Sequence, residues 1–68
     1  MYILNEKAKK ELSIYNISKV AKTIGINAQT LSEMIRKDRT CMKLTAYCIT
    51  KFLNSDKEIE DYFIRKEI

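Results

Sequence analysis

The sequence contains no histidine, proline or tryptophan, and only one glycine and two cysteines among its 68 residues. Without histidine it lacks the base of Ser-His-Asp catalysis, and a single glycine cannot form a glycine-rich phosphate loop. Two cysteines also fall short of the four Cys or His ligands of a structural zinc site. A chain of this length forms one small domain, which buries only about 60% of the surface that its unfolded form exposes. We therefore expect a single domain over residues 1–68, not an enzyme, with no catalytic residues, cofactor or metal site.

The two cysteines, Cys41 and Cys48, are seven residues apart in the sequence. On one continuous helix their Cα atoms would lie about 10.5 Å apart along the axis, which is too far for a disulfide. Reduced, packed thiols are typical of intracellular proteins. We therefore predict packing roles for both cysteines, and redox sensing is the less favoured alternative.

The apolar start of the chain, Met1–Leu4, gives way at once to the polar residues Asn5, Glu6 and Lys7. This run is too short for the apolar segment of a signal peptide, and far shorter than the roughly 20 residues of a membrane span. We expect a soluble, cytoplasmic protein with no membrane contact.

Charge is unevenly distributed along the chain. Residues 1–53 hold ten Lys or Arg and four Asp or Glu, a net charge of +6, whereas residues 54–68 hold three and five, a net charge of −2. A basic body favours a polyanion such as DNA as partner, although many basic surfaces are merely solvated. The acidic end indicates a separate task for the tail.

Hydrophobic spacing along the chain is typical of an all-α domain with short connections. Five helices are predicted, over about residues 5–13, 16–24, 28–36, 42–53 and 56–66. The inward stripe of the fourth is expected to contain Met42, Ala46, Ile49, Phe52 and Leu53.

The connection between the second and third predicted helices contains the one glycine, Gly25. Glycine adopts the left-handed conformation just beyond a helix end without the steric cost of a Cβ. Asn16 and Asn27 are suited to cap the two helices, and Ile26 supplies a buried turn residue. The segment therefore predicts a helix, a three-residue turn and another helix.

This segment, ISKVAKTIGINAQTLSEMIR from Ile17 to Arg36, resembles the helix-turn-helix of the Cro/repressor family, the XRE-like group. The family has a small residue at the position of Ala21 and a glycine four positions later, at Gly25. Its apolar positions correspond to Val20, Ile24, Ile26, Leu31 and Met34. The resemblance covers about residues 5–53. It implies a compact five-helix domain whose third helix enters the major groove of double-stranded DNA.

The chain departs from the family pattern just after the third helix. Family members often have a glycine or asparagine there, whereas this chain has Lys37-Asp38-Arg39-Thr40.

The outward stripe of the third helix is the candidate DNA-reading surface. At about 100° per residue, Gln29, Glu33 and Arg36 point away from the apolar side. A Gln amide can pair with adenine, and a carboxylate can accept from cytosine N4. The predicted base-reading residues are Ala28, Gln29, Thr30, Ser32 and Glu33. The predicted phosphate contacts are Asn16, Ser18, Lys22, Arg36, Lys37, Arg39, Thr40 and Lys43. The alternative for each of them is an ordinary solvated surface residue.

The tail begins with a predicted capping box between Ser55 and Glu58, which starts the fifth helix. The apolar face of this predicted helix, widened by Ile64 and Ile68, is larger than a small core needs to bury. The predicted dimer contact consists of Ile59, Tyr62 and Phe63. A helix that simply closes the core is an equally favoured interpretation of this face.

Two functions remain open. The first is a sequence-specific transcriptional regulator that resembles the Cro-type repressors of phages and mobile elements and reads a palindromic operator as a homodimer. The second is a protein-binding helix-turn-helix module, such as an antirepressor or an inhibitor of a host nuclease.

Overall fold

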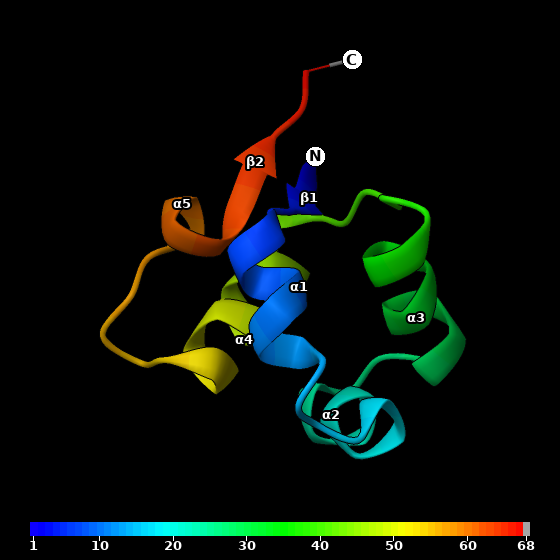
Figure 1. Cartoon of the computed structure of the whole chain (residues 1–68). Coiled ribbons are helices and arrows are strands. Elements are labelled where there is room, and N and C mark those ends of the chain that lie inside the picture. The colour runs from blue at the N-terminus through cyan, green and yellow to red at the C-terminus, as the bar shows by residue number, and fades with distance from the viewer. Residues whose placement is uncertain (68) are drawn as a thin grey trace.

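The computed structural model describes residues 1–67 and contains five helices and a two-stranded antiparallel sheet. The elements in chain order are β1 (Tyr2–Leu4), α1 (Glu6–Leu12), α2 (Ile17–Ile24), α3 (Ala28–Arg36), α4 (Lys43–Leu53), α5 (Ile59–Tyr62) and β2 (Phe63–Arg65). The all-α prediction is therefore wrong, because both ends of the chain form strands. In Figure 1, α1 lies between α3 on one side and α5 on the other, with α2 at one end of the molecule and the sheet of β1 and β2 at the other.

Three asparagines start the first three helices, and two of them, Asn16 and Asn27, are the caps that the sequence predicts. Asn5 Oδ1 accepts a hydrogen bond from the backbone N–H of Ala8 at 2.8 Å. Asn16 does the same for Lys19 at 3.2 Å, and Asn27 for Gln29 at 2.7 Å. Each bond satisfies one of the backbone donors that a helix start leaves without an intrahelical partner.

Gly25 ends α2 in the left-handed conformation, with φ of 90°. Its N–H and that of Ile26 both donate to the carbonyl of Ala21, at 2.8 and 2.9 Å. No atom lies within 4 Å of the place where a Cβ would stand, so the backbone angle alone favours glycine here. The predicted three-residue turn is confirmed.

The tail differs most from its prediction. Only Ile59–Tyr62 is helical, and the start signal lies at Glu58, whose N–H donates to Asp61 Oδ2 at 2.9 Å, not at Ser55. The chain then leaves the helix at Phe63, and Phe63–Arg65 pairs antiparallel with Tyr2–Leu4. The strand alternation buries Phe63 and exposes Ile64. Ile68 lies outside the described residues.

The side chains predicted to join two copies of the chain are in its own core. Ile59, Tyr62 and Phe63 are 6%, 1% and 4% exposed, so they offer no free face. The Tyr62 hydroxyl donates to Glu11 Oε1 of α1 at 3.0 Å, and burial together with this bond raises the pKa of Tyr62. Core closure is thus the role that these residues have in the folded chain.

The remainder of the core comes from β1, from α1 to α4 and from the α3–α4 connection. Its other buried hydrophobic members are Leu4, Ala8, Leu12, Val20, Ala21, Leu31, Met34, Cys41, Ala46 and Ile49. Met42, predicted to point inward, is exposed because it precedes the first residue of α4 as its N-cap.

The two cysteines do not share a helix. Cys41 lies before α4 and forms an isolated antiparallel bridge with Tyr2, and Cys48 is on α4. Both thiols are free, Cys41 being buried and Cys48 half-buried. Burial raises the pKa of the Cys41 thiol to about 11, which keeps it protonated and unreactive near neutral pH.

The connection between α3 and α4 contains the one non-glycine residue with positive φ among residues 1–67, Asp38 at 52°. This is the region of the chain in which the Cro/repressor family often has glycine or asparagine. An L-residue in the left-handed region costs about 1–2 kcal/mol, and Asp and Asn bear that cost better than most. The Asp38 carboxylate also pairs with Lys9 of α1 and raises the pKa of its ammonium group.

These two properties of Asp38 can be separated by substitution. We expect Asp38→Ala to lower the free energy of unfolding by about 1–2 kcal/mol, because alanine resists the left-handed backbone. Asp38→Asn should cost clearly less, because it keeps the backbone preference and loses only an exposed ion pair. Urea unfolding measures both. Equal losses for the two variants would assign the effect to the carboxylate and would contradict the backbone explanation.

Candidate nucleic-acid interface

The predicted motif has the bounds that the sequence suggested, since α2 starts at Ile17 and α3 ends at Arg36. The two helices pack through Val20 and Ala21 on one side and Leu31 and Met34 on the other, all of them buried. The small side chain of Ala21 allows close approach of the helices, and the turn at Gly25 sets their mutual direction. As a result α3 lies at one side of the molecule (Figure 1).

The outward face of α3 begins with Gln29, whose side chain is exposed. The other predicted base-reading residues, Ala28, Thr30, Ser32 and Glu33, are all half-buried. The exposed amide therefore stands at the start of the helix, one residue after the capped N-terminus.

Glu33 has a partner that the sequence did not indicate. Arg39 Nη1 donates to Glu33 Oε1 at 2.6 Å, from six residues further along the chain. The hydrogen bond from Arg39 is the main cause that lowers the pKa of Glu33, with smaller contributions from Gln29 and Lys37. The carboxylate is thus ionised and balanced by a basic neighbour, and Arg39 is held against the outward face of α3.

The α3–α4 connection is held at both ends. Near its start, Asp38 pairs with Lys9 and Arg39 pairs with Glu33. At its end, the N–H of Cys41 donates to the Tyr2 carbonyl at 2.8 Å, and the Tyr2 N–H donates to the Cys41 carbonyl at 2.9 Å. The basic residues of this connection are consequently fixed beside the end of α3.

All eight predicted phosphate contacts are exposed, and they form two groups. Asn16, Ser18 and Lys22 lie at the start of α2 or along it, and Arg36, Lys37, Arg39, Thr40 and Lys43 lie between the end of α3 and the start of α4. The Asn16 side-chain carbonyl already caps α2, which leaves its amide group for a ligand.

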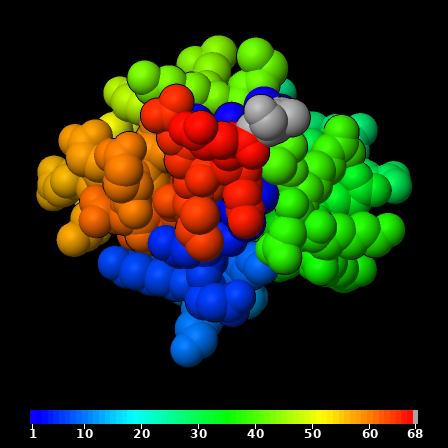
Figure 2. Space-filling view, turned by 90° about the horizontal axis from the view of Figure 1, so that it is seen from above, coloured from blue at the N-terminus to red at the C-terminus, as the bar shows by residue number. Residues whose placement is uncertain are grey.

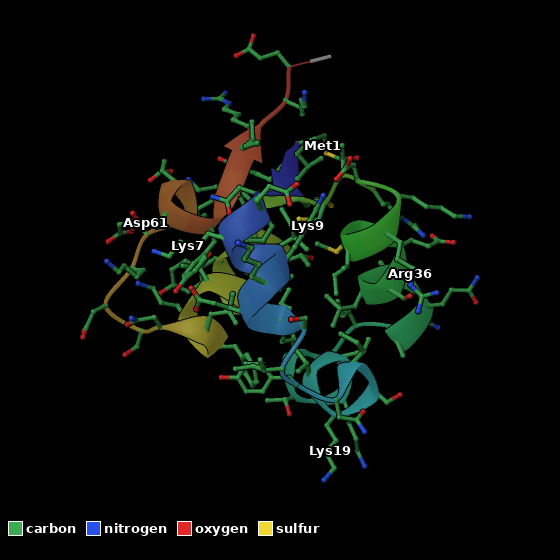
Figure 3. All side chains as sticks on the ribbon, in the orientation of Figure 1. Met1, Lys7, Lys9, Lys19, Arg36 and Asp61 are labelled. Carbon is green, nitrogen blue, oxygen red and sulfur yellow. The ribbon has the colours of Figure 1, made fainter. Side chains whose placement is uncertain are left out.

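Lys19, another exposed lysine on α2, is not among the phosphate contacts predicted from the sequence. Figure 3 shows its side chain extending away from the molecule at the α2 end. Lys19 is three residues before Lys22, a spacing that puts the two lysines on neighbouring parts of one helix surface. That spacing was the signal from which it could have been found.

The acidic part of the tail lies away from α3. Four exposed carboxylates, Asp56, Glu58, Glu60 and Asp61, precede or belong to α5. In Figure 3, Asp61 and Arg36 are on opposite sides of the molecule, separated by α1. The negative charges therefore do not oppose a polyanion bound along α3.

Residues 1–67 contain no group of three His, Cys, Asp or Glu residues able to hold a metal ion. A surface groove of about 370 Å³ lies between α2 and α4 and is lined by Thr23, Ile24, Tyr47, Cys48, Lys51 and Phe52. Within the described part of the chain, no helix is both long and apolar enough to cross a bilayer.

Comparisons with known proteins identify no relative: the sequence matches no protein-family model, and neither the curated proteins nor the solved structures give a match to the chain.

Proposed function

We propose that the chain is a sequence-specific, double-stranded DNA-binding transcriptional regulator of the Cro/repressor type, which acts in the cytoplasm and inserts α3 into the major groove. The observation that carries the proposal is the outward face of α3, which begins with an exposed Gln29 and is flanked by two groups of exposed basic and polar residues. A helix held at a fixed angle by a tight turn, with cations on both of its flanks, fits the groove and its two phosphate rims.

Within this proposal, Gln29 carries most of the base readout. Its amide can donate to and accept from one adenine in the groove, a bidentate contact that distinguishes base pairs. Ala28 and Thr30 can meet thymine methyl groups, and Ser32 can bond to several bases. Glu33, paired with Arg39, mainly weakens binding to sequences other than the operator, because its carboxylate is repelled by an acceptor group on a base edge.

A palindromic operator read by two copies of the chain remains part of the proposal. The burial of Ile59, Tyr62 and Phe63 means that the contact between such copies uses other residues. Repression is the favoured outcome, because a small domain that covers an operator excludes other proteins from it.

A protein-binding module is the second candidate, and one observation favours it. Leu44 and Tyr47 of α4 are 73% and 50% exposed, and Tyr47 also lines the groove between α2 and α4. Exposed apolar side chains that cluster on a helix are typical of protein contacts. This surface belongs to different helix faces from the outward side of α3, so substitutions can distinguish the two candidates.

Salt dependence of DNA binding tests the leading proposal. Each phosphate neutralised on duplex DNA contributes about 0.9 to the slope of log Kobs against log salt concentration. Full engagement of the five basic residues among the predicted contacts, Lys22, Arg36, Lys37, Arg39 and Lys43, corresponds to a slope of about −4 to −5 per bound chain. Mobility shifts on the DNA flanking its own gene, at several salt concentrations, measure it. No specific complex, or a slope near zero, would favour the protein-binding alternative.

Base recognition and phosphate contact should be separable in two single variants. Gln29→Ala removes an exposed side chain and preserves the fold, and we expect it to weaken operator binding by about 1–3 kcal/mol with little change on unrelated DNA. Lys43→Ala should weaken both and reduce the salt slope by about one unit. Competition binding with operator and unrelated duplexes measures both patterns. If Gln29→Ala left affinity and base preference unchanged in a folded protein, α3 would not be the reading helix.

A further inference from the structure

Tyr2 is the middle member of a short ladder that joins three segments of the chain. On one side it pairs with Cys41, through two backbone hydrogen bonds of 2.8 and 2.9 Å. On the other side it stands opposite Arg65 in the β1–β2 register. Neighbouring strands are about 4.8 Å apart, so the Cα atoms of Cys41 and Arg65 are separated by about 10 Å.

This ladder connects the end of β2 to the predicted phosphate contacts that precede α4. Arg39 and Thr40 immediately precede Cys41, and Arg39 is itself bound to Glu33 on the outward face of α3. The path from the reading helix to Arg65 therefore runs through consecutive short contacts.

The surface at the end of the β1–β2 sheet is positively charged and open to solvent. Arg65 and Lys66 are exposed, and neither forms an ion pair within residues 1–67. They line a surface hollow of about 320 Å³ together with Met1 and Glu67, so two basic side chains stand there against one acidic side chain. The Lys66 N–H donates to the Met1 carbonyl at 2.7 Å, which fixes the backbone at this point.

The structure divides the tail into two parts of opposite charge. The carboxylates of residues 56–61 belong to the α5 region, whereas Arg65 is the last residue of β2 and Lys66 follows it. Figure 2 shows β2 and residues 66–67 on the surface, with the α5 region on one side and the α3 region on the other. The net charge of −2 for residues 54–68 conceals this division.

We propose that Arg65 and Lys66 bind backbone phosphates of the same duplex that α3 enters, which extends the DNA contact beyond the helix-turn-helix to the paired ends of the chain. The inference rests on the proposed function. Both side chains are exposed and line the same surface hollow, so they can contact neighbouring phosphates from one side of the molecule. Their contribution is independent of sequence, because phosphate contacts carry no base information.

The test is the salt slope of a double variant, Arg65→Gln with Lys66→Gln, on the operator duplex and on an unrelated duplex. We expect the slope to become shallower by about 1.8 on both, since two phosphate contacts are lost, with the preference for the operator unchanged. Lys7→Gln is the matched control, because Lys7 is an exposed lysine that Figure 3 places on the Asp61 side of α1. Its slope should equal that of the wild type.

A charge-preserving variant, Arg65→Lys with Lys66→Arg, guards against an effect of altered folding. It should keep the wild-type slope even if its thermal stability changes as much as that of the neutral variant. If DNA binding by the wild type depended steeply on salt and the neutral variant had the same slope, this inference would be overturned and the proposed function would stay intact. A wild type that binds no DNA would overturn both.

Discussion

The backbone of Tyr2 is the constraint on which the arrangement of this small domain depends. Its N–H and carbonyl are both bound to Cys41, while β1 as a whole pairs with β2. One three-residue strand thereby fixes the end of the α3–α4 connection and the end of the chain at the same place. Leu4 and Phe63 stand opposite each other in the β1–β2 register, and both side chains are buried in the core. A domain of this size has few buried contacts, so such backbone pairing adds order that packing alone would not supply.

The charged side chains on the surface of the domain are unevenly distributed. Basic side chains along α2 and after α3 surround a helix whose one acidic residue, Glu33, is balanced by Arg39. Asp61, in the acidic α5 region, lies on the far side of α1 from Arg36 of α3 (Figure 3). Such a separation creates a field that steers a polyanion toward one side of the molecule and away from the other. The proposed function follows from this separation together with the exposed start of α3.

Local signals made α1 to α4 predictable, and long-range pairing made the rest unpredictable. Asn5, Asn16 and Asn27 mark helix starts by side-chain chemistry that acts over three residues, and Gly25 marks a turn in the same way. The strands have three residues each, too few to show a period of two, and their partners stand at opposite ends of the sequence. The spacing of Ile59, Tyr62 and Phe63 correctly indicated one buried face, but the sequence did not show that the same chain covers it. The Glu33–Arg39 pair spans six residues, a separation at which helical periodicity gives no signal.

The central claim is that α3, with the basic residues on its flanks, is the surface that meets DNA. Amide chemical shifts of the labelled chain, recorded while a duplex from the DNA flanking its own gene is added, test it residue by residue. We predict the largest changes over residues 16–22, 28–33 and 36–43, with residues 56–61 unchanged. Changes concentrated on Leu44, Tyr47 and the groove between α2 and α4, or none that saturate with added duplex, would contradict the account.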